Sequence, residues 1–308
     1  MQKGHSGLFR KLKMNNYKPE GYNFNSAANK EYLNSPQLLE KAMQNKTIIE
    51  AKAVLCDNCF NLIVEIPGFH AVIPHEEVAL TPDGAPCKEI AAITRVGKSV
   101  SFIIESIEKD KMTLSRKKAQ ELCIEKYISK LETGEVIDAR VTHFEPFGAF
   151  CDIGCGVTAL LSIDSISVSR ISHPKDRFRI GQYIKAAVRN IEENGKLIKI
   201  SLTHKELLGT WRENADRFSV GQTVAGIVRS VESYGIFVEL TPNLSGLSEL
   251  KEGVEPGQTA AVYIKNIIYE KMKVKLVIVD FHSCEGIQEK KNDYFITSGN
   301  INGWDYYN

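Results

Sequence analysis

The sequence predicts a mainly β chain built from three small β units that follow one another and are joined by short helices. One observation is a run with an aromatic residue on each side of a glycine, at residues 147–150, which recurs at residues 234–237. A second is that residues 221–240 match residues 134–153 without a gap. Recurrence at a fixed offset is the mark of repeated structural units. The 308 residues also leave room for two or three domains.

The composition narrows the class of protein. The net charge of +1 argues against a strongly cationic surface, although local basic faces remain open. No apolar run is long enough to span a membrane, and residues 1–10 lack the apolar core of a secretory signal. Seven scattered cysteines, an odd number, are typical of a reducing cytosol rather than a disulfide framework. We therefore expect a cytoplasmic protein with no membrane partner.

Residues 1–34 are polar and aperiodic, so the sequence predicts a flexible N-terminal tail. Its basic residues could touch phosphates, but a solvated tail is the favoured interpretation. Three aromatic residues could anchor it: Tyr17, Tyr22 and Phe24. Ser35 and Pro36 then supply an N-cap and a first-turn proline for a helix.

The first unit, together with that helix, spans residues 35–118. Strands are expected at residues 48–55, 62–66 and 71–74, but the aromatic pair that marks the other two units is absent. We therefore expect a degenerate unit with weak ligand contact and a docking or spacing role.

This unit also holds a metal-like set of residues, Cys56, Cys59, His70 and His75. Two thiolates and two imidazoles could make a tetrahedral zinc site. We favour the alternative, in which the cysteines lie at a strand end and the histidines border the third strand. No metal and no cofactor are expected.

Two linker helices are predicted, at residues 119–133 and 206–220. Each carries an apolar stripe, and such stripes usually pack within the molecule. Trp211 on the second stripe could stack on a base, but a core position is favoured.

The second unit, residues 134–205, contains the clearest aromatic run. Mostly apolar residues at strand-like spacing precede the run, and a short strand that closes in a tight turn follows it. A glycine inside a strand is costly unless the backbone bulges or approaches another group closely. A bulge at Gly148 would bring Phe147 and Phe150 to one face, where they could stack on unpaired bases. The open alternative is that both rings belong to the core of the unit.

The order of these features resembles a known family. A glycine, an alternating strand, Phe-Gly-x-Phe, a glycine turn, a variable loop, Gly-Gln, a long strand and a Leu-Ser-x-Lys ending follow one another. The ending appears at residues 114–117 and, as Leu-Thr-His-Lys, at residues 202–205. This pattern resembles the S1 RNA-binding domain, named after ribosomal protein S1. The resemblance covers most of residues 46–280 and implies tandem five-stranded barrels of the oligonucleotide-binding class (OB-fold).

The resemblance also implies RNA contacts in the second unit. Ser162 stands where many family members carry a histidine that faces the nucleic acid, and a hydroxyl can still reach phosphate or sugar. Arg189 and Lys199 match positions that the family often uses for basic contacts. The loop at residues 169–179 is the densest basic stretch outside the tail. Although charge runs are usually solvated, we predict that this loop borders the aromatic platform and contacts phosphates through Arg170, Lys175, Arg177 and Arg179.

The third unit, residues 221–280, keeps Tyr234 and Phe237 as its platform. The offset between matched residues falls from 87 to 76, so about eleven residues are missing where the second unit has its basic loop. Acidic residues replace those cations, and Lys273 is among the lysines that partly offset them. We expect weaker binding here than in the second unit.

The C-terminal tail, residues 281–308, alternates polar and aromatic residues. Because an exposed aromatic tail would be unusual, we expect it to pack on the third barrel or on a partner. A similar ending accompanies three-unit S1-like proteins of clostridial-type bacteria.

Catalysis is not expected, because no glycine-rich phosphate loop, nucleophile elbow or paired-carboxylate signature stands apart from the repeat. His143, Asp152 and Asp164 could be imagined as a nuclease site, but polar strand residues are expected simply to face outward. The resemblance implies a non-catalytic binder of single-stranded RNA, in particular messenger RNA, that acts in translation at the small ribosomal subunit. The alternative is a docking protein whose degenerate barrels bind a ribosomal or transcription partner. We expect a monomer without a small-molecule substrate, and a moderate, salt-sensitive affinity with little base preference.

Overall fold

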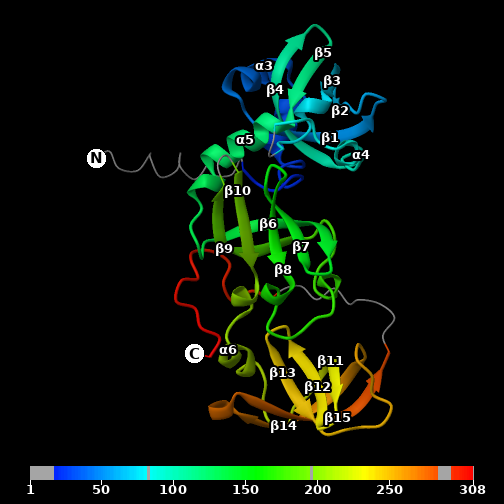
Figure 1. Ribbon diagram of the computed structural model, residues 1–308, viewed down its shortest axis with the longest axis vertical. Coiled ribbons are helices and arrows are strands. Elements are labelled where there is room, and N and C mark those ends of the chain that lie inside the picture. Colours follow the sequence, from blue (N-terminus) through cyan, green and yellow to red (C-terminus); the bar gives the residue numbers. More distant parts are fainter. Residues whose placement is uncertain (1–16, 82–83, 195–196, 284–292, 308) are drawn as a thin grey trace, which may run out of the picture.

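Three closed five-stranded barrels form a column in the computed structural model, which describes residues 17–81, 84–194, 197–283 and 293–307 (Figure 1). The predicted mainly β fold class is confirmed. In each barrel the first three strands form an antiparallel meander, and the third strand pairs in parallel with the fifth. The fourth strand then closes the barrel against the first.

The strands have the following bounds. The first barrel contains β1 (Ile49–Cys56), β2 (Leu62–Ile66), β3 (Phe69–Ile73), β4 (Ser99–Glu108) and β5 (Lys111–Ser115). The second contains β6 (Val136–Glu145), β7 (Gly148–Gly154), β8 (Val157–Ser162), β9 (Tyr183–Asn194) and β10 (Leu197–Thr203). The third contains β11 (Thr223–Glu232), β12 (Gly235–Thr241), β13 (Leu244–Ser248), β14 (Thr259–Ile268) and β15 (Lys273–His282).

Short helices precede and connect the barrels. The α-helices are α2 (Ala27–Leu33), α3 (Pro36–Asn45), α4 (Glu89–Ile93), α5 (Arg116–Lys126) and α6 (Trp211–Ala215). The 3-10 helices are η1 (His75–Glu77), η2 (Ile128–Lys130), η3 (Ile163–Ser165), η4 (Pro174–Asp176), η5 (Lys205–Leu208) and η6 (Tyr269–Lys271).

Side-chain caps fix where the helices begin. The Ser35 hydroxyl accepts a hydrogen bond from the Leu38 amide at the start of α3, with proline in the first turn as expected. Ser115, the last residue of β5, caps α5 in the same way, so this helix begins at Arg116 rather than at the predicted residue 119. A capping box begins α6, and Trp211 on that helix lies in the core of the third barrel, as predicted.

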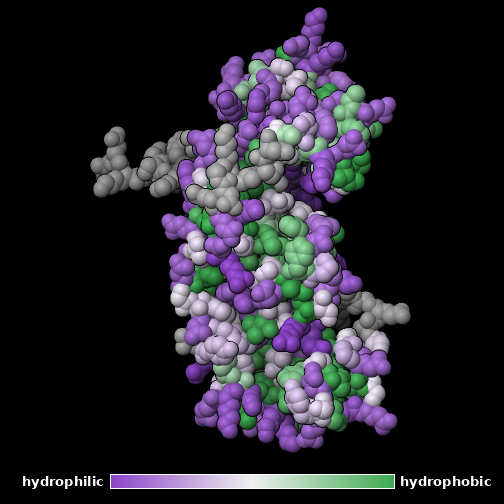
Figure 2. All heavy atoms as spheres, viewed as in Figure 1, coloured by the Kyte–Doolittle hydropathy of each residue, from purple (hydrophilic) through white to green (hydrophobic). Residues whose placement is uncertain are grey.

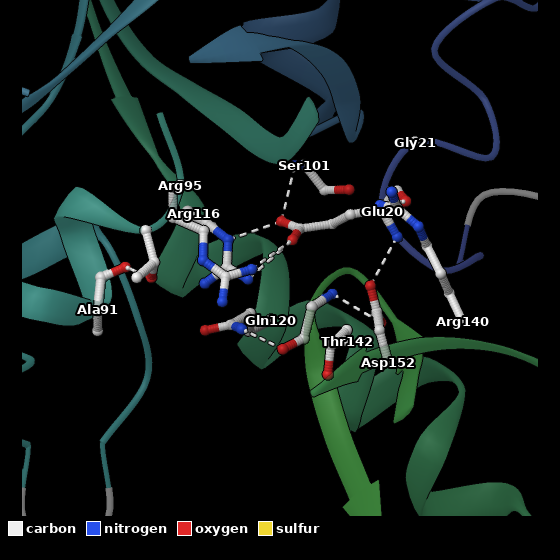
Figure 3. A network of polar contacts seen from close by, with 12 residues as sticks. Glu20, Gly21, Ala91, Arg95, Ser101, Arg116, Gln120, Arg140, Thr142 and Asp152 are labelled. Atoms are coloured by element: carbon white, nitrogen blue, oxygen red, sulfur yellow. Dashed lines mark hydrogen bonds and ion pairs between the residues drawn. The ribbon is translucent and has the colours of Figure 1, made fainter. Parts of the chain in front are cut away.

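A buried ion pair joins the first barrel to the second. Arg116, at the start of α5, donates hydrogen bonds of 2.6 and 3.0 Å to the Glu20 carboxylate, and both residues are 3% exposed. The Glu20 amide in turn donates to Asp152 of β7 at 2.7 Å. In Figure 3 the side chains of Glu20 and Arg116 point toward one another between the two barrels, with Asp152 beside them. Residues 17–34, the N-terminal strap, therefore bridge the first and second barrels at this junction.

Two sequence predictions are wrong at this junction. Residues 17–34 are not part of a flexible tail, because their backbone and side chains bond to both barrels. Asp152 does not face solvent. It points away from the barrel core, between Cys151 and Ile153, but the N-terminal strap covers it.

The carboxyl groups of the junction differ in protonation. Burial, followed by the charge of Glu20, raises the pKa of Asp152 to about 7 and that of Glu50 to about 8. Burial acts on the Glu20 carboxyl in the same direction, but the adjacent Arg116 outweighs it and lowers the pKa. Glu20 is therefore the group that stays ionised and compensates the buried guanidinium.

A second buried ion pair joins the second barrel to the third. Both terminal nitrogens of Arg177 donate to the fully buried carboxylate of Glu239 on β12, at 2.9 and 2.5 Å. The loop that precedes η4 also docks here, since the Ser169 amide donates to the Pro242 carbonyl at 3.0 Å. Glu239 and Asp152 are equivalent positions of the repeat, so the same strand position anchors both junctions.

The C-terminal residues 293–307 pack mainly on the second barrel. The Val136 amide donates to the Gly299 carbonyl, and the Ile301 amide donates to the Gly134 carbonyl, both at 2.9 Å. Only the end of the segment returns to the third barrel, where Tyr306 packs on the core. The expectation of packing on the third barrel or on a partner therefore did not include the second barrel.

His204, which follows β10, is buried where the C-terminal segment meets the second barrel. Its Nδ1 lies 2.8 Å from the Ile166 carbonyl oxygen, and its Nε2 lies 3.2 Å from the Tyr294 hydroxyl oxygen. Burial lowers the pKa of His204 from its usual 6.5 to about 4. The imidazole is therefore neutral in the folded protein at neutral pH.

This histidine predicts an acid-sensitive stability. The unfolded chain binds a proton at this histidine below about pH 6.5, but the folded chain does so only below about pH 4. The stability that depends on neutral His204 is therefore fully present above pH 6.5 and is lost as the pH falls from 6.5 to 4. At about 1.4 kcal/mol per pKa unit, the loss in the free energy of unfolding is about 3 kcal/mol. Urea denaturation across this pH range measures the free energy of unfolding of the unaltered chain and of His204→Gln. The glutamine keeps a donor for the Ile166 carbonyl, and the variant should show a shallower pH dependence. Equal pH dependence in the two proteins would contradict the assignment.

Candidate nucleic-acid interface

Two aromatic rings lie together on the surface of the second barrel. Phe147 occupies the tight turn between β6 and β7 and is 55% exposed, while Phe150 on β7 is half-buried. Their ring centroids are 6.3 Å apart and the rings are nearly perpendicular, at 86°. The alternative in which both rings belong to the barrel core does not hold. In Figure 2 apolar side chains gather over the part of the column that carries β7 and β8.

Gly148, between the two rings, allows β7 and β8 to approach closely and does not form a bulge. A Cβ atom on Gly148 would lie 2.5 Å from the Leu161 carbonyl oxygen of β8, so only glycine fits. The bulge is on the neighbouring strand, between Val141 and His143. It places His143 opposite Phe150, and these two rings stack at 6.3 Å and 24°. The sequence interpretation missed His143 as a member of this surface.

Hydroxyl and guanidinium groups continue the surface beside the rings. Ser162 pairs with Gly148 across the β7–β8 ladder, and its hydroxyl donates to the Ser165 hydroxyl oxygen at 3.0 Å. Arg189 Nη1 donates to the same Ser165 oxygen at 2.7 Å. Three of the predicted contact residues, Phe147, Ser162 and Arg189, therefore lie near one another, linked through a serine that the prediction did not include.

Lys199 lies on the same outward face, farther from the rings. Phe150 of β7 pairs with Leu160 of β8, and Leu160 pairs with Ser201 of β10. Lys199 is two residues before Ser201, so its side chain is on the same side of the strand. Its side chain is exposed.

The basic loop does not border the ring pair as one unit. Arg177 is buried against Glu239, so its predicted RNA contact is wrong in this arrangement. Arg170 is exposed but lines a pocket against the third barrel. Lys175 within η4 and Arg179 just after it are exposed, and they stay predicted contacts. The reason is the docking of the third barrel, which draws part of the loop away from the rings.

The third barrel repeats the ring geometry. Tyr234 is 67% exposed, and its ring lies 6.1 Å from that of Phe237 at 88°. Lys273 is exposed at the start of β15. The ladder places a different lysine, Lys275, beside this pair, because Phe237 pairs with Leu247 and Leu247 with Lys275.

Comparison with known families agrees with this geometry. The family model of the S1 RNA binding domain matches residues 130–203, a span that contains the five strands of the second barrel. The second barrel is an S1 domain. The other two barrels share its strand order, so the chain is a tandem of three S1-like barrels.

Relatives of this chain include ribosomal proteins. The small ribosomal subunit protein bS1 homolog of Bacillus subtilis is 29% identical over 265 residues, which are 77% of this chain and 64% of that protein. The bS1 protein of Staphylococcus epidermidis is 29% identical over 200 residues, which are 59% of this chain and 50% of that protein. The chain thus spans about half to two thirds of the length of these relatives.

Among solved structures, a multidomain protein with nucleic acid binding domains from Streptococcus pneumoniae is 17% identical and has a TM-score of 0.26. The alignment covers 79% of this chain and 76% of that one.

The first S1-like barrel carries no ring pair on its β1–β2 hairpin. Leu55 there is 56% exposed. Cys56 is half-buried, Cys59 is exposed, and His75 Nε2 lies 2.9 Å from the Cys87 carbonyl oxygen. Within the described part of the chain, no group of three or more His, Cys, Asp or Glu side chains could hold a metal ion. Nor does any described helix have the length and apolarity to cross a bilayer.

Proposed function

We propose that the chain is a non-catalytic binder of single-stranded RNA, and that the S1 domain in its middle carries most of the affinity. The observation that supports this most is the exposed ring pair of Phe147 and Phe150, with Ser162 and Arg189 beside it. Base stacking on exposed aromatic rings contributes about 1–3 kcal/mol per base and accepts any base. The neighbouring cations would neutralise phosphates.

We also propose, more finely, that the chain binds messenger RNA in translation at the small ribosomal subunit, in the cytoplasm, as a monomer. The ribosomal part of this proposal is supported by the relatives named as small ribosomal subunit proteins. Fixed junctions favour this role. The barrels are tied by buried ion pairs, so a strand bound to one barrel would meet the next at a raised effective concentration.

The test is fluorescence anisotropy with a labelled single-stranded oligoribonucleotide at two salt concentrations. We expect binding that weakens with salt, with a slope of about −0.7 in the logarithm of affinity per phosphate contacted. An intact chain that fails to bind at low salt would contradict the proposal.

The first barrel favours a second candidate, docking on a ribosomal or transcription protein. Its β1–β2 hairpin has no ring pair of its own, since Phe60 there packs against His75 of η1. The barrel exposes apolar residues on its hairpin and on or beside α4: Val54, Leu55, Ile90, Ile93 and Val96. Co-sedimentation with small ribosomal subunits from native lysate separates the two. Under the docking candidate, Phe147→Ala/Phe150→Ala co-sediments as well as the unaltered chain. Under the RNA proposal, that association is lost.

A further inference from the structure

A pocket of about 540 Å³ lies where the second barrel, the third barrel and the C-terminal segment meet. The second barrel contributes residues 168–170, and the third contributes Arg229, Tyr234 and Phe237. The C-terminal segment contributes Tyr306 and Tyr307. In Figure 1 this segment runs beside the second barrel and ends near α6, between the two barrels. The volume lies within the range of small-ligand sites.

Hydrogen bonds hold the walls of the pocket in place. On one side, the Val168 amide donates to Asn243 Oδ1 at 3.1 Å. On the other, the Tyr306 hydroxyl donates to the Asn243 carbonyl oxygen at 2.6 Å, and the Trp211 amide donates to the Tyr306 carbonyl at 3.1 Å. Because Asn243 binds both walls, the site is formed before a ligand arrives.

Exposed rings from two separate parts of the chain line this pocket. Tyr234 is 67% exposed and Tyr307 is 76% exposed, and each is supported by a second ring. Phe237 supports the first at 6.1 Å, and Tyr306 supports the second at 5.4 Å. Rings that pack against a second ring and stay open to solvent suit the stacking of a nucleobase.

A guanidinium with spare hydrogen-bonding capacity completes the pocket. Arg229 Nε donates to Glu239 at 2.7 Å, but the same carboxylate already binds both terminal nitrogens of Arg177. Two cations thus share one anion. Arg229 Nη2 is buried and has no hydrogen-bond partner within the residues that the structure describes. Arg170 adds an exposed cation to the lining, against one carboxylate, that of Glu232.

We propose that this pocket is a second RNA site, in which a base stacks on Tyr234 and Tyr307 and the attached phosphate binds Arg229. A buried donor without a partner is costly, and a phosphate oxygen would satisfy it with a charge-assisted hydrogen bond. The inference rests on the proposed function, because it assigns a second contact for the same strand. Under this proposal, the third barrel binds RNA only in combination with the second barrel and the C-terminal segment.

The test compares Tyr307→Ala and Arg229→Gln in the full chain, with labelled oligouridylate long enough for two barrels at about 4–16 nucleotides each. Tyr307 is mostly exposed, and in Arg229→Gln the Glu239 carboxylate keeps Arg177, so both variants should fold. We expect each to weaken binding about fivefold or more. Arg229→Gln should also reduce the salt slope by about 0.7, the value for one phosphate contact on a single strand.

Matched controls are Tyr263→Ala and Arg212→Gln, an exposed ring and an exposed cation outside the pocket. Both should bind as the unaltered chain does. Unchanged affinity and slope in Tyr307→Ala and Arg229→Gln, while Phe147→Ala/Phe150→Ala loses binding, would overturn the pocket and leave the proposed function standing. Failure of the unaltered chain to bind overturns both. Uridine monophosphate binding as tightly as the oligouridylate would mean a free-nucleotide site, and would overturn the RNA assignment.

Discussion

Arg116→Met is expected to lower the free energy of unfolding by about 3–5 kcal/mol at neutral pH, because it leaves a buried carboxylate without its cation. Arg116 donates two hydrogen bonds to Glu20 and a third, of 3.0 Å, to the Val78 carbonyl. Among the described residues, Arg95 is the other cation that pairs with the Glu20 carboxylate, at 3.6 Å and partly exposed, so it compensates poorly. Urea denaturation followed by circular dichroism measures the loss.

The sign of the pH effect distinguishes this mechanism from simple loss of packing. Without Arg116, burial and the neighbouring carboxyl groups would raise the pKa of Glu20 above its usual value, so the folded variant would take up a proton more readily than the unfolded chain. The deficit should therefore shrink as the pH falls toward about 5. Lys126→Met is the matched control, a half-exposed cation on the same helix, and should leave stability unchanged. A deficit that is constant with pH would contradict the ion-pair account.

Phe147→Ala/Phe150→Ala is expected to remove most of the RNA affinity of the second barrel. Each ring that stacks on a base contributes about 1–3 kcal/mol, so the pair predicts a loss of roughly 30-fold or more. The fold should survive, because Phe147 is 55% exposed and Phe150 lies outside the barrel core. Anisotropy with labelled oligoribonucleotide measures the loss.

Leu55→Ala supplies the matched control for that change. Leu55 is 56% exposed and lies near the end of β1, on the hairpin of the first barrel that corresponds to the one with Phe147. Its removal takes away a similar exposed apolar side chain without a ring and should leave RNA affinity as it is. Equal losses in both variants would point to a general effect on the surface rather than to stacking.

Internal repetition made the fold predictable from the sequence. The match of Tyr234 to Phe147 is reproduced in space, with ring separations of 6.1 and 6.3 Å. Strand positions followed because glycines and alternating apolar residues are local signals. The cap at Ser35 and the core position of Trp211 were read in the same local way.

What could not be predicted depends on how the barrels stack. Asp152 and Glu239 look like outward-facing strand residues, and relative to their own barrels they are, but a neighbouring segment or barrel buries each. Arg177 lies in an aperiodic loop, so nothing local shows that it pairs with a carboxylate 62 residues away. The equivalent positions of the two acids in the repeat were the available signal.

The most direct measurement is ultraviolet cross-linking of a single-stranded oligoribonucleotide to the intact chain, followed by mapping of the modified peptides. The proposal predicts cross-links at Phe147 and Phe150, with His143 on the same surface, and their loss on competition with unlabelled RNA. Cross-links confined to the first barrel, or to surfaces that carry neither ring pair, would contradict the claim that the exposed rings of the S1 domain hold the bases.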